Sequence, residues 1–205
     1  MSKLPPHKYL LARLKRNQRN DIIWENISSM GDIDIEFVRE FKDRLAWHKL
    51  NWNPNIKFNE EFIDEFKDYI DWESVSRFTE LSENCIFKYA NYLNIRKYVK
   101  WFMVSEKVME RFADQIDWGD VSFKQKMSDK FIKKHRDRLG IDFLGLNPFI
   151  PKKLQNLLTK LRWEGKFENS QYYDGHTQHM KERYAKAVKV FNTLPELDEY
   201  FAKVK

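Results

Sequence analysis

Residues 105–122 read SEKVMERFADQIDWGDVS, and this stretch decides the fold because much of the chain repeats it. Residues 59–76 carry a close copy, NEEFIDEFKDYIDWESVS, and residues 128–145 carry a more divergent one, SDKFIKKHRDRLGIDFLG. Self-similarity at a fixed period indicates that each copy is one structural unit that packs against its neighbours.

Each copy opens with a residue type that caps helix N-termini, and acidic residues follow in every case. The successive caps, spaced 25, 23, 23 and 23 residues apart, are Asp34, Asn59, Ser82, Ser105 and Ser128. Their side chains can accept hydrogen bonds from first-turn amides, and the positive end of the helix dipole favours the acids. We therefore predict a helix after each cap.

Apolar residues then recur in an i, i+1, i+4, i+8 pattern, which indicates an amphipathic helix of about three turns. Its aromatic members, the predicted repeat core, include Phe37, Phe62, Phe66, Phe112 and Phe131. The central positions that follow are Trp24 (in a degenerate first copy), Trp47, Trp72, Ile95, Trp118 and Ile141. A short second segment then carries one apolar residue in register: Ile27, Leu50, Val75, Tyr98, Val121 and Leu144. Each unit is therefore predicted to be a small helical hairpin.

A single hairpin cannot bury its apolar face, whereas stacked hairpins can. The expected fold is all-α: an α-solenoid-like array of short helical hairpin repeats with a C-terminal helical cap. We expect a basic N-terminal helix and degenerate repeat at 1–33, the array at 34–165, and a loop with two capping helices at 166–205. The stripe Leu154, Leu157, Leu158, Leu161 and Trp163 marks a divergent last unit. Thr193 to Glu196 resembles a capping box that opens the final helix.

Recurring polar residues are interpreted as structural. Asp71 and Asp117 directly precede Trp72 and Trp118, so we expect them to cap the next segment or to accept the indole N–H. The lone cysteine, Cys85, occupies a core position of its repeat and is predicted to be buried.

The charge of the chain is distributed unevenly. Residues 1–20 carry +6, residues 21–120 carry −8 and residues 121–205 carry +8. Such polarity can present two different electrostatic faces to a partner. The candidate binding residues are Lys8, Arg13, Lys15, Arg16, Arg19, Lys130, Lys133, Lys134, Arg136, Arg138, Lys152, Lys153, Tyr172, Tyr173, Lys181 and Arg183. A polar capping helix at 1–20 and a solvated helix face at 124–138 are the alternatives that involve no partner.

Catalytic signatures are absent from the sequence: it contains no glycine-rich phosphate loop, GxSxG or HExxH. His176 and His179 share a helical face but lack a third ligand at metal-site spacing. We therefore expect no enzyme activity, no cofactor and no metal. No signal peptide and no apolar stretch long enough to span a membrane are present, which fits a cytoplasmic location.

The unit S-E-x-F-I-x-x-F-x-D-x-I-D-W-x-x-V-S closely resembles short helical repeats of uncharacterised bacteriophage and large-DNA-virus proteins. The resemblance covers residues 34–150 and is sharpest at 59–82 and 105–122. The copies at 82–104 and 128–150 depart from it by lacking the Trp and one or more Asp. The resemblance implies a viral or mobile-element origin and a binding role, without naming a reaction.

The expected function is that of a non-enzymatic helical-repeat binding protein, phage-encoded, that docks on a host or phage macromolecular complex. Inhibition of that complex would be a natural use, by analogy. The alternative is an RNA- or DNA-binding protein that uses the basic N-terminal arm and the basic C-terminal half. A third and weaker hypothesis is a nuclease or transferase site near residues 172–179. The sequence leaves the oligomeric state open.

Overall fold

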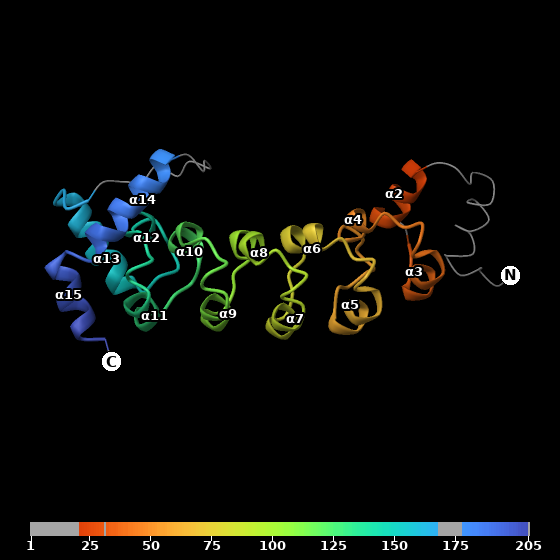
Figure 1. Cartoon of the computed structure of the whole chain (residues 1–205), viewed down its shortest axis with the longest axis horizontal. Coiled ribbons are helices and arrows are strands. Elements are labelled where there is room, and N and C mark those ends of the chain that lie inside the picture. The colour runs from red at the N-terminus through yellow and green to blue at the C-terminus, as the bar shows by residue number, and fades with distance from the viewer. Residues whose placement is uncertain (1–20, 31, 168–177, 205) are drawn as a thin grey trace. The chain divides into compact units, whose positions relative to one another are not determined.

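The computed structural model describes residues 21–30, 32–167 and 178–204. These residues form fourteen helices and no strand, which confirms the predicted all-α array of short helical repeats (Figure 1). The chain divides into two compact units, one ending at Asn94 and the other beginning at Ile95. The repeat that starts at Ser82 thus contributes its first helix to one unit and its second helix to the other.

The N-terminal unit contains six described helices. They are α2 (Asp21–Met30), α3 (Ile35–Phe41), α4 (Trp47–Leu50), α5 (Glu60–Phe66), α6 (Trp72–Phe78) and α7 (Glu83–Lys88). Within this unit α3, α5 and α7 lie along one side, and α2, α4 and α6 along the other (Figure 1).

The C-terminal unit contains eight described helices. They are α8 (Ile95–Trp101), α9 (Glu106–Arg111), α10 (Trp118–Lys124), α11 (Asp129–Lys134), α12 (Ile141–Leu144), α13 (Lys152–Trp163), α14 (Gln178–Phe191) and α15 (Pro195–Ala202). The second helices α8, α10 and α12 stack in sequence, and α14 packs on α12.

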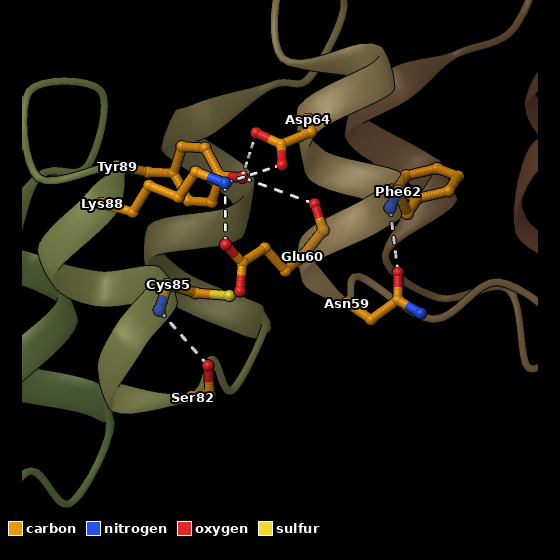
Figure 2. A network of polar contacts seen from close by, with 8 residues as sticks. All are labelled: Asn59, Glu60, Phe62, Asp64, Ser82, Cys85, Lys88 and Tyr89. Atoms are coloured by element: carbon orange, nitrogen blue, oxygen red, sulfur yellow. Dashed lines mark hydrogen bonds and ion pairs between the residues drawn. The ribbon is translucent and has the colours of Figure 1, made fainter.

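All five predicted caps adopt the extended backbone of an N-cap and accept a hydrogen bond from an amide in the helix that follows. Asn59 and Ser82 illustrate the geometry: they accept from Phe62 at 2.9 Å and from Cys85 at 3.3 Å (Figure 2). These local signals fix where each repeat begins.

The first helices are shorter than predicted, at six or seven residues instead of about three turns. The helices α7 and α11, whose repeats carry Ile95 and Ile141 at the central position, are as short as those whose repeats carry a tryptophan. The indole N–H donates to the carbonyl five residues earlier: Trp47 to Lys42, Trp72 to Lys67 and Trp118 to Ala113, each at 2.9 Å. In the three repeats with a tryptophan, the indole thus satisfies a carbonyl at the end of the first helix that has no partner in the helix itself. The predicted indole contact to a carboxylate is therefore wrong, whereas Asp71 and Asp117 do cap α6 and α10.

The same tryptophan rings join successive repeats. Trp47 packs 5.5 Å from Phe66, Trp72 packs 5.7 Å from Tyr89, and Trp118 packs 6.3 Å from Phe131. These rings are only partly buried, whereas Trp24 and the predicted phenylalanines of the core are buried. Each Trp thus covers the apolar face of the next first helix.

The register of the second helices is as predicted: Ile27, Leu50, Val75, Tyr98, Val121 and Leu144 are all buried. Buried serines tie neighbouring second helices together. Ser122 donates to Trp118 O at 2.6 Å and accepts from the amide of Gly140 at 3.1 Å. Ser76 makes the matching pair of contacts with Trp72 and Asn94.

The C-terminal helices differ from expectation in two details. Trp163 is 87% exposed, because α13 turns only Leu154, Leu158 and Leu161 fully inward. The capping box at Thr193 does not form: Leu194 is the N-cap of α15 without a side-chain hydrogen bond, and the Thr193 hydroxyl donates back to Val190 O at 3.2 Å. Pro195 fixes the first turn of α15 instead.

Candidate functional site

The basic run on α11 and after it, predicted as a binding face, contacts other parts of its own unit at most of its positions. Lys133 donates to Val204 O at 3.0 Å, and Lys134 pairs with Glu110 at 2.7 Å. The Nε–H of Arg136 donates to Phe191 O at 2.8 Å, and its Nη1 pairs with Asp198. These three cations therefore hold neighbouring helices together.

Arg138 is used in the same way. Its Nη1 lies 3.1 Å from both Ala113 O and Asp114 Oδ1, and its guanidinium lies 5.5 Å from the ring of Trp118. Lys124 donates to Lys100 O, and burial lowers the pKa of its ammonium group. The positive charge that this face offers to a partner is therefore smaller than the sequence suggests.

The remaining predicted cations that the structure describes are mostly exposed. Lys130 and Lys153 lie exposed on α11 and α13, and Lys152 makes one surface contact to Gln155 at 3.1 Å. Lys181 is exposed on α14, and Arg183 on the same helix is partly buried and lines a cavity beside α12. The described contacts do not bring these predicted binding residues together on one surface.

Eight residues singled out in the sequence lie outside the described residues. Seven of them are predicted binding residues, and the eighth, His176, is one of the two histidines considered as metal ligands. They are Lys8, Arg13, Lys15, Arg16, Arg19, Tyr172, Tyr173 and His176. The side chain of His179 also lies outside the described part of the chain.

A polar cluster in the N-terminal unit resembles a catalytic arrangement at first sight (Figure 2). Lys88 lies 2.7 Å from both Glu60 and Asp64, and the Tyr89 hydroxyl donates to Asp64 at 2.7 Å. Lys88 and Tyr89 lower the pKa of the Asp64 carboxyl, while burial and the bond to Asp64 raise the pKa of Tyr89 to about 12.

The cluster is nevertheless a link between repeats. Its ion-pairing side chains are about half exposed. The C-terminal unit carries the equivalent contact between Lys134 and Glu110, each 46 residues further along the chain. An arrangement that recurs from repeat to repeat, and joins α5 to α7 as it joins α9 to α11, is explained by stacking of first helices.

Exposed aromatic side chains form a second set of candidates, which the sequence reasoning missed. In the N-terminal unit Trp52 is 58% exposed and Phe78 is 49% exposed, and their rings lie 5.1 Å apart. Both residues come at or just after the C-terminal end of a second helix, two or three positions beyond its buried register residue. An exposed pair of this size is unusual on a surface that has no partner.

The C-terminal unit has one exposed aromatic side chain at a corresponding place, Trp101, and another, Phe149, five residues beyond the buried register residue Leu144. Trp101 ends α8 and is 55% exposed, and Phe149 follows α12 and is 50% exposed. Phe149 lines an open groove of about 540 Å³ together with Val104, Met127 and Lys126. The signal for these residues was available in the sequence: Trp52 and Trp101 are large aromatic residues that fall outside the predicted core stripe.

The described residues also bear on metal binding and on membrane crossing. They contain no group of three or more His, Cys, Asp or Glu side chains that could hold a metal ion. Cys85 is buried, as predicted. Among the helices of this part of the chain, none combines the length and the apolar character that crossing a membrane requires.

The chain matches no protein-family model, and no curated protein or solved structure is significantly similar to it.

Proposed function

We propose that this chain is a non-enzymatic binding protein that docks on another protein through the exposed aromatic residues at the ends of its second helices. The observation that carries the proposal is the recurrence of Trp52, Phe78 and Trp101 at that place, each about half exposed. Repeat arrays bind partners through surfaces that repeat from unit to unit. Tryptophan and other large aromatic residues dominate the binding energy of protein interfaces.

The position of these residues supports the proposal further. The repeat core is already filled by the phenylalanines and by the Trp or Ile that starts the second helices α4, α6, α8, α10 and α12. Trp52 and Trp101 lie outside this core, and each leaves more than half of its surface in water, which costs free energy in the absence of a partner. The repeat motif adds the proposal of a phage-encoded protein acting in the host cytoplasm, where binding would block a host or phage complex.

The test is affinity purification of the tagged chain from host lysate, with and without nuclease, followed by mass spectrometry. A stoichiometric protein partner that survives nuclease is the expected result. The double variants Trp52→Ala/Phe78→Ala and Trp101→Ala/Phe149→Ala should each reduce recovery of that partner at least about tenfold. Trp163→Ala is the matched control, because Trp163 is more exposed but lies on α13, outside the recurring position. Equal recovery with all variants would contradict the proposal.

Nucleic-acid binding remains the second candidate, and the charge of +8 on residues 121–205 favours it. The exposed lysines available for phosphate contacts include Lys126, Lys130 and Lys153. The affinity for a labelled single strand should then fall steeply with salt, with a log–log slope that reflects several phosphates. Absence of binding at about 50 mM salt, or binding insensitive to salt, would remove this candidate.

A further inference from the structure

A cavity of about 260 Å³ lies in the C-terminal unit, between α12, the residues that follow α13, and α14. Figure 1 shows these helices gathered at the same end of that unit. Ile141 and Asp142 line it from α12, Lys166 and Phe167 from the segment after α13, and Arg183 and Lys186 from α14. Three separate segments of the chain line it, and it is open to solvent, since Lys166 and Lys186 are exposed; a small molecule could enter it.

Three of the lining side chains are cationic, and they come from two separate segments. Lys166 forms a partly exposed ion pair with Glu196 at 3.7 Å, which offsets part of its positive potential. Asp142 is the carboxylate that lines the cavity; it is 6% exposed and accepts from the amide of Phe143 at 2.9 Å. Among the described residues, three cations and one carboxylate line the cavity, which favours an anion of more than one charge.

The rest of the wall is apolar. Phe167 is 8% exposed and Ala187 is 7% exposed, and Ile141 and Val190 complete this side. The guanidinium of Arg162 lies 5.7 Å from the Phe167 ring, and its Nε and Nη2 atoms are buried without a hydrogen-bond partner. This fourth cation, close to the cavity wall, adds to the positive potential. A ligand with an anionic end and a flat or apolar body matches such a wall.

We propose that this cavity binds a small phosphomonoester, with its phosphate beside Lys166, Arg183 and Lys186 and a hydroxyl or amino group of its body near Asp142. Three cations favour a ligand with a phosphate dianion over a ligand with a single carboxylate, because the phosphate carries more negative charge and more acceptor oxygens. The carboxylate of Asp142 gives the cavity a hydrogen-bond acceptor for the body of the ligand. The residues that line the cavity include none of the exposed aromatic residues of the proposed protein interface, so the two sites can be tested separately.

The test is isothermal titration calorimetry of the full chain with three probes: AMP, adenosine and inorganic phosphate. AMP should bind saturably with one site per chain, at a Kd below about 1 mM. Adenosine should bind at least about tenfold more weakly, because it lacks the phosphate. No saturable binding of AMP or phosphate at up to about 10 mM, or equal binding of AMP and adenosine, would overturn the proposal.

Variants on α14 locate the site. Lys186→Gln and Arg183→Gln should each weaken AMP binding at least about fivefold, and the double variant more. Lys181→Gln and Lys189→Gln are matched controls, since both side chains are exposed on the same helix outside the cavity. They should change the affinity less than about twofold. Circular dichroism establishes that each variant retains its helices. If folded control variants and folded cavity variants lost equal affinity for AMP, the assignment of the site would be contradicted.

Discussion

The guanidinium of Arg136 lies 5.2 Å from the ring of Phe191 and donates its Nε–H to the carbonyl oxygen of the same residue. Phe191 ends α14, so the contact satisfies a carbonyl that the helix itself leaves unpaired. The same guanidinium lies 5.5 Å from Phe201 and pairs with Asp198, both on α15. One side chain that follows α11 therefore fixes both C-terminal helices to the last repeats.

Arg136→Ala should detach α14 and α15 from the C-terminal unit. The Arg136 side chain is only 14% exposed, and its removal leaves a buried carbonyl and two rings without their contact. We expect a loss of about 2–4 kcal/mol in the free energy of unfolding of this part of the chain. Hydrogen exchange measures it directly, as faster exchange of amides in 178–191 and 195–202. Lys130→Ala, an exposed position on α11, should leave these amides unchanged; unchanged exchange in Arg136→Ala would refute the role.

The buried serines are the second target. Ser122→Ala removes the hydroxyl that accepts from the Gly140 amide, so that a buried N–H loses its partner. The expected loss is about 1–3 kcal/mol, and Ser76→Ala should behave alike through the Asn94 amide. Urea unfolding followed by Trp fluorescence gives the values. Thr159→Ala, an exposed hydroxyl on α13, should cost less than about 0.5 kcal/mol. The prediction would be contradicted if the two serine variants lost no more stability than Thr159→Ala.

Aspartates recur at two positions of the repeat, Asp71 with Asp117 and Asp68 with Asp114. Substitutions at the two positions should differ in their effect on stability. Asp71 accepts from the amides of Glu73 and Ser74, at 3.1 and 3.3 Å, and so caps α6. Asp71→Ala should cost about 1 kcal/mol, whereas Asp71→Asn should cost a few tenths, because asparagine caps equally well. Asp68→Ala, at an exposed recurring carboxylate, should be neutral. Thermal unfolding distinguishes these variants, and equal loss in the alanine and asparagine variants would indicate a charge effect instead of a cap.

The repeat boundaries could be predicted because the signals that set them are local. Ser105 and Ser128 accept from amides three residues later, so the residue type and the acid beside it are sufficient. The second-helix register was predictable for a similar reason. Tyr98 and Val121, 23 residues apart, occupy the same position and are both buried. The repeat period alone therefore predicts that a residue is buried when its equivalent in the neighbouring copy is buried.

The use of the basic run could not be predicted, because its partners lie far away in the sequence. Arg136 contacts Phe191, 55 residues further on, and Lys133 contacts Val204, 71 residues further on. From the sequence alone, a cluster of cations is interpreted as a solvated or anion-binding face, because the sequence does not show which helices pack over it. The role of Asn147, whose amide donates to Ser122 O at 3.0 Å, was hidden in the same way. Asn53 makes the matching contact to Ser28 O, so the Asn-Pro pairs at 53–54 and 147–148 form one recurring device.

His135 departs from the repeat, since the equivalent positions hold Phe41, Phe66, Tyr89 and Phe112. Its ring packs 4.5 Å from Phe131 and 5.0 Å from Trp118, in the place of the missing aromatic ring. Its Nε2 is buried without a hydrogen-bond partner, as Glu110 lies 3.7 Å away, beyond hydrogen-bond range. Burial, together with the charge of Lys134, lowers the pKa of the imidazole below its ordinary value.

The sign of the resulting pH dependence follows from that direction. A histidine whose pKa is lower in the folded state binds fewer protons there than in the unfolded chain, so the fold loses stability as the pH falls below about 6.5. His135→Phe should remove this loss, and should also add about 1 kcal/mol at pH 7 by replacing an unpaired polar atom with an apolar one. Urea unfolding at pH 7.5 and pH 5.5 provides the comparison, and the gain in the variant should be larger at pH 5.5. His48→Phe, at an exposed histidine on α4, is the control and should show no such pH-dependent gain. A gain equal at both pH values would show that the folded and unfolded chains bind the same number of protons at His135, and would contradict the lowered pKa in the folded chain.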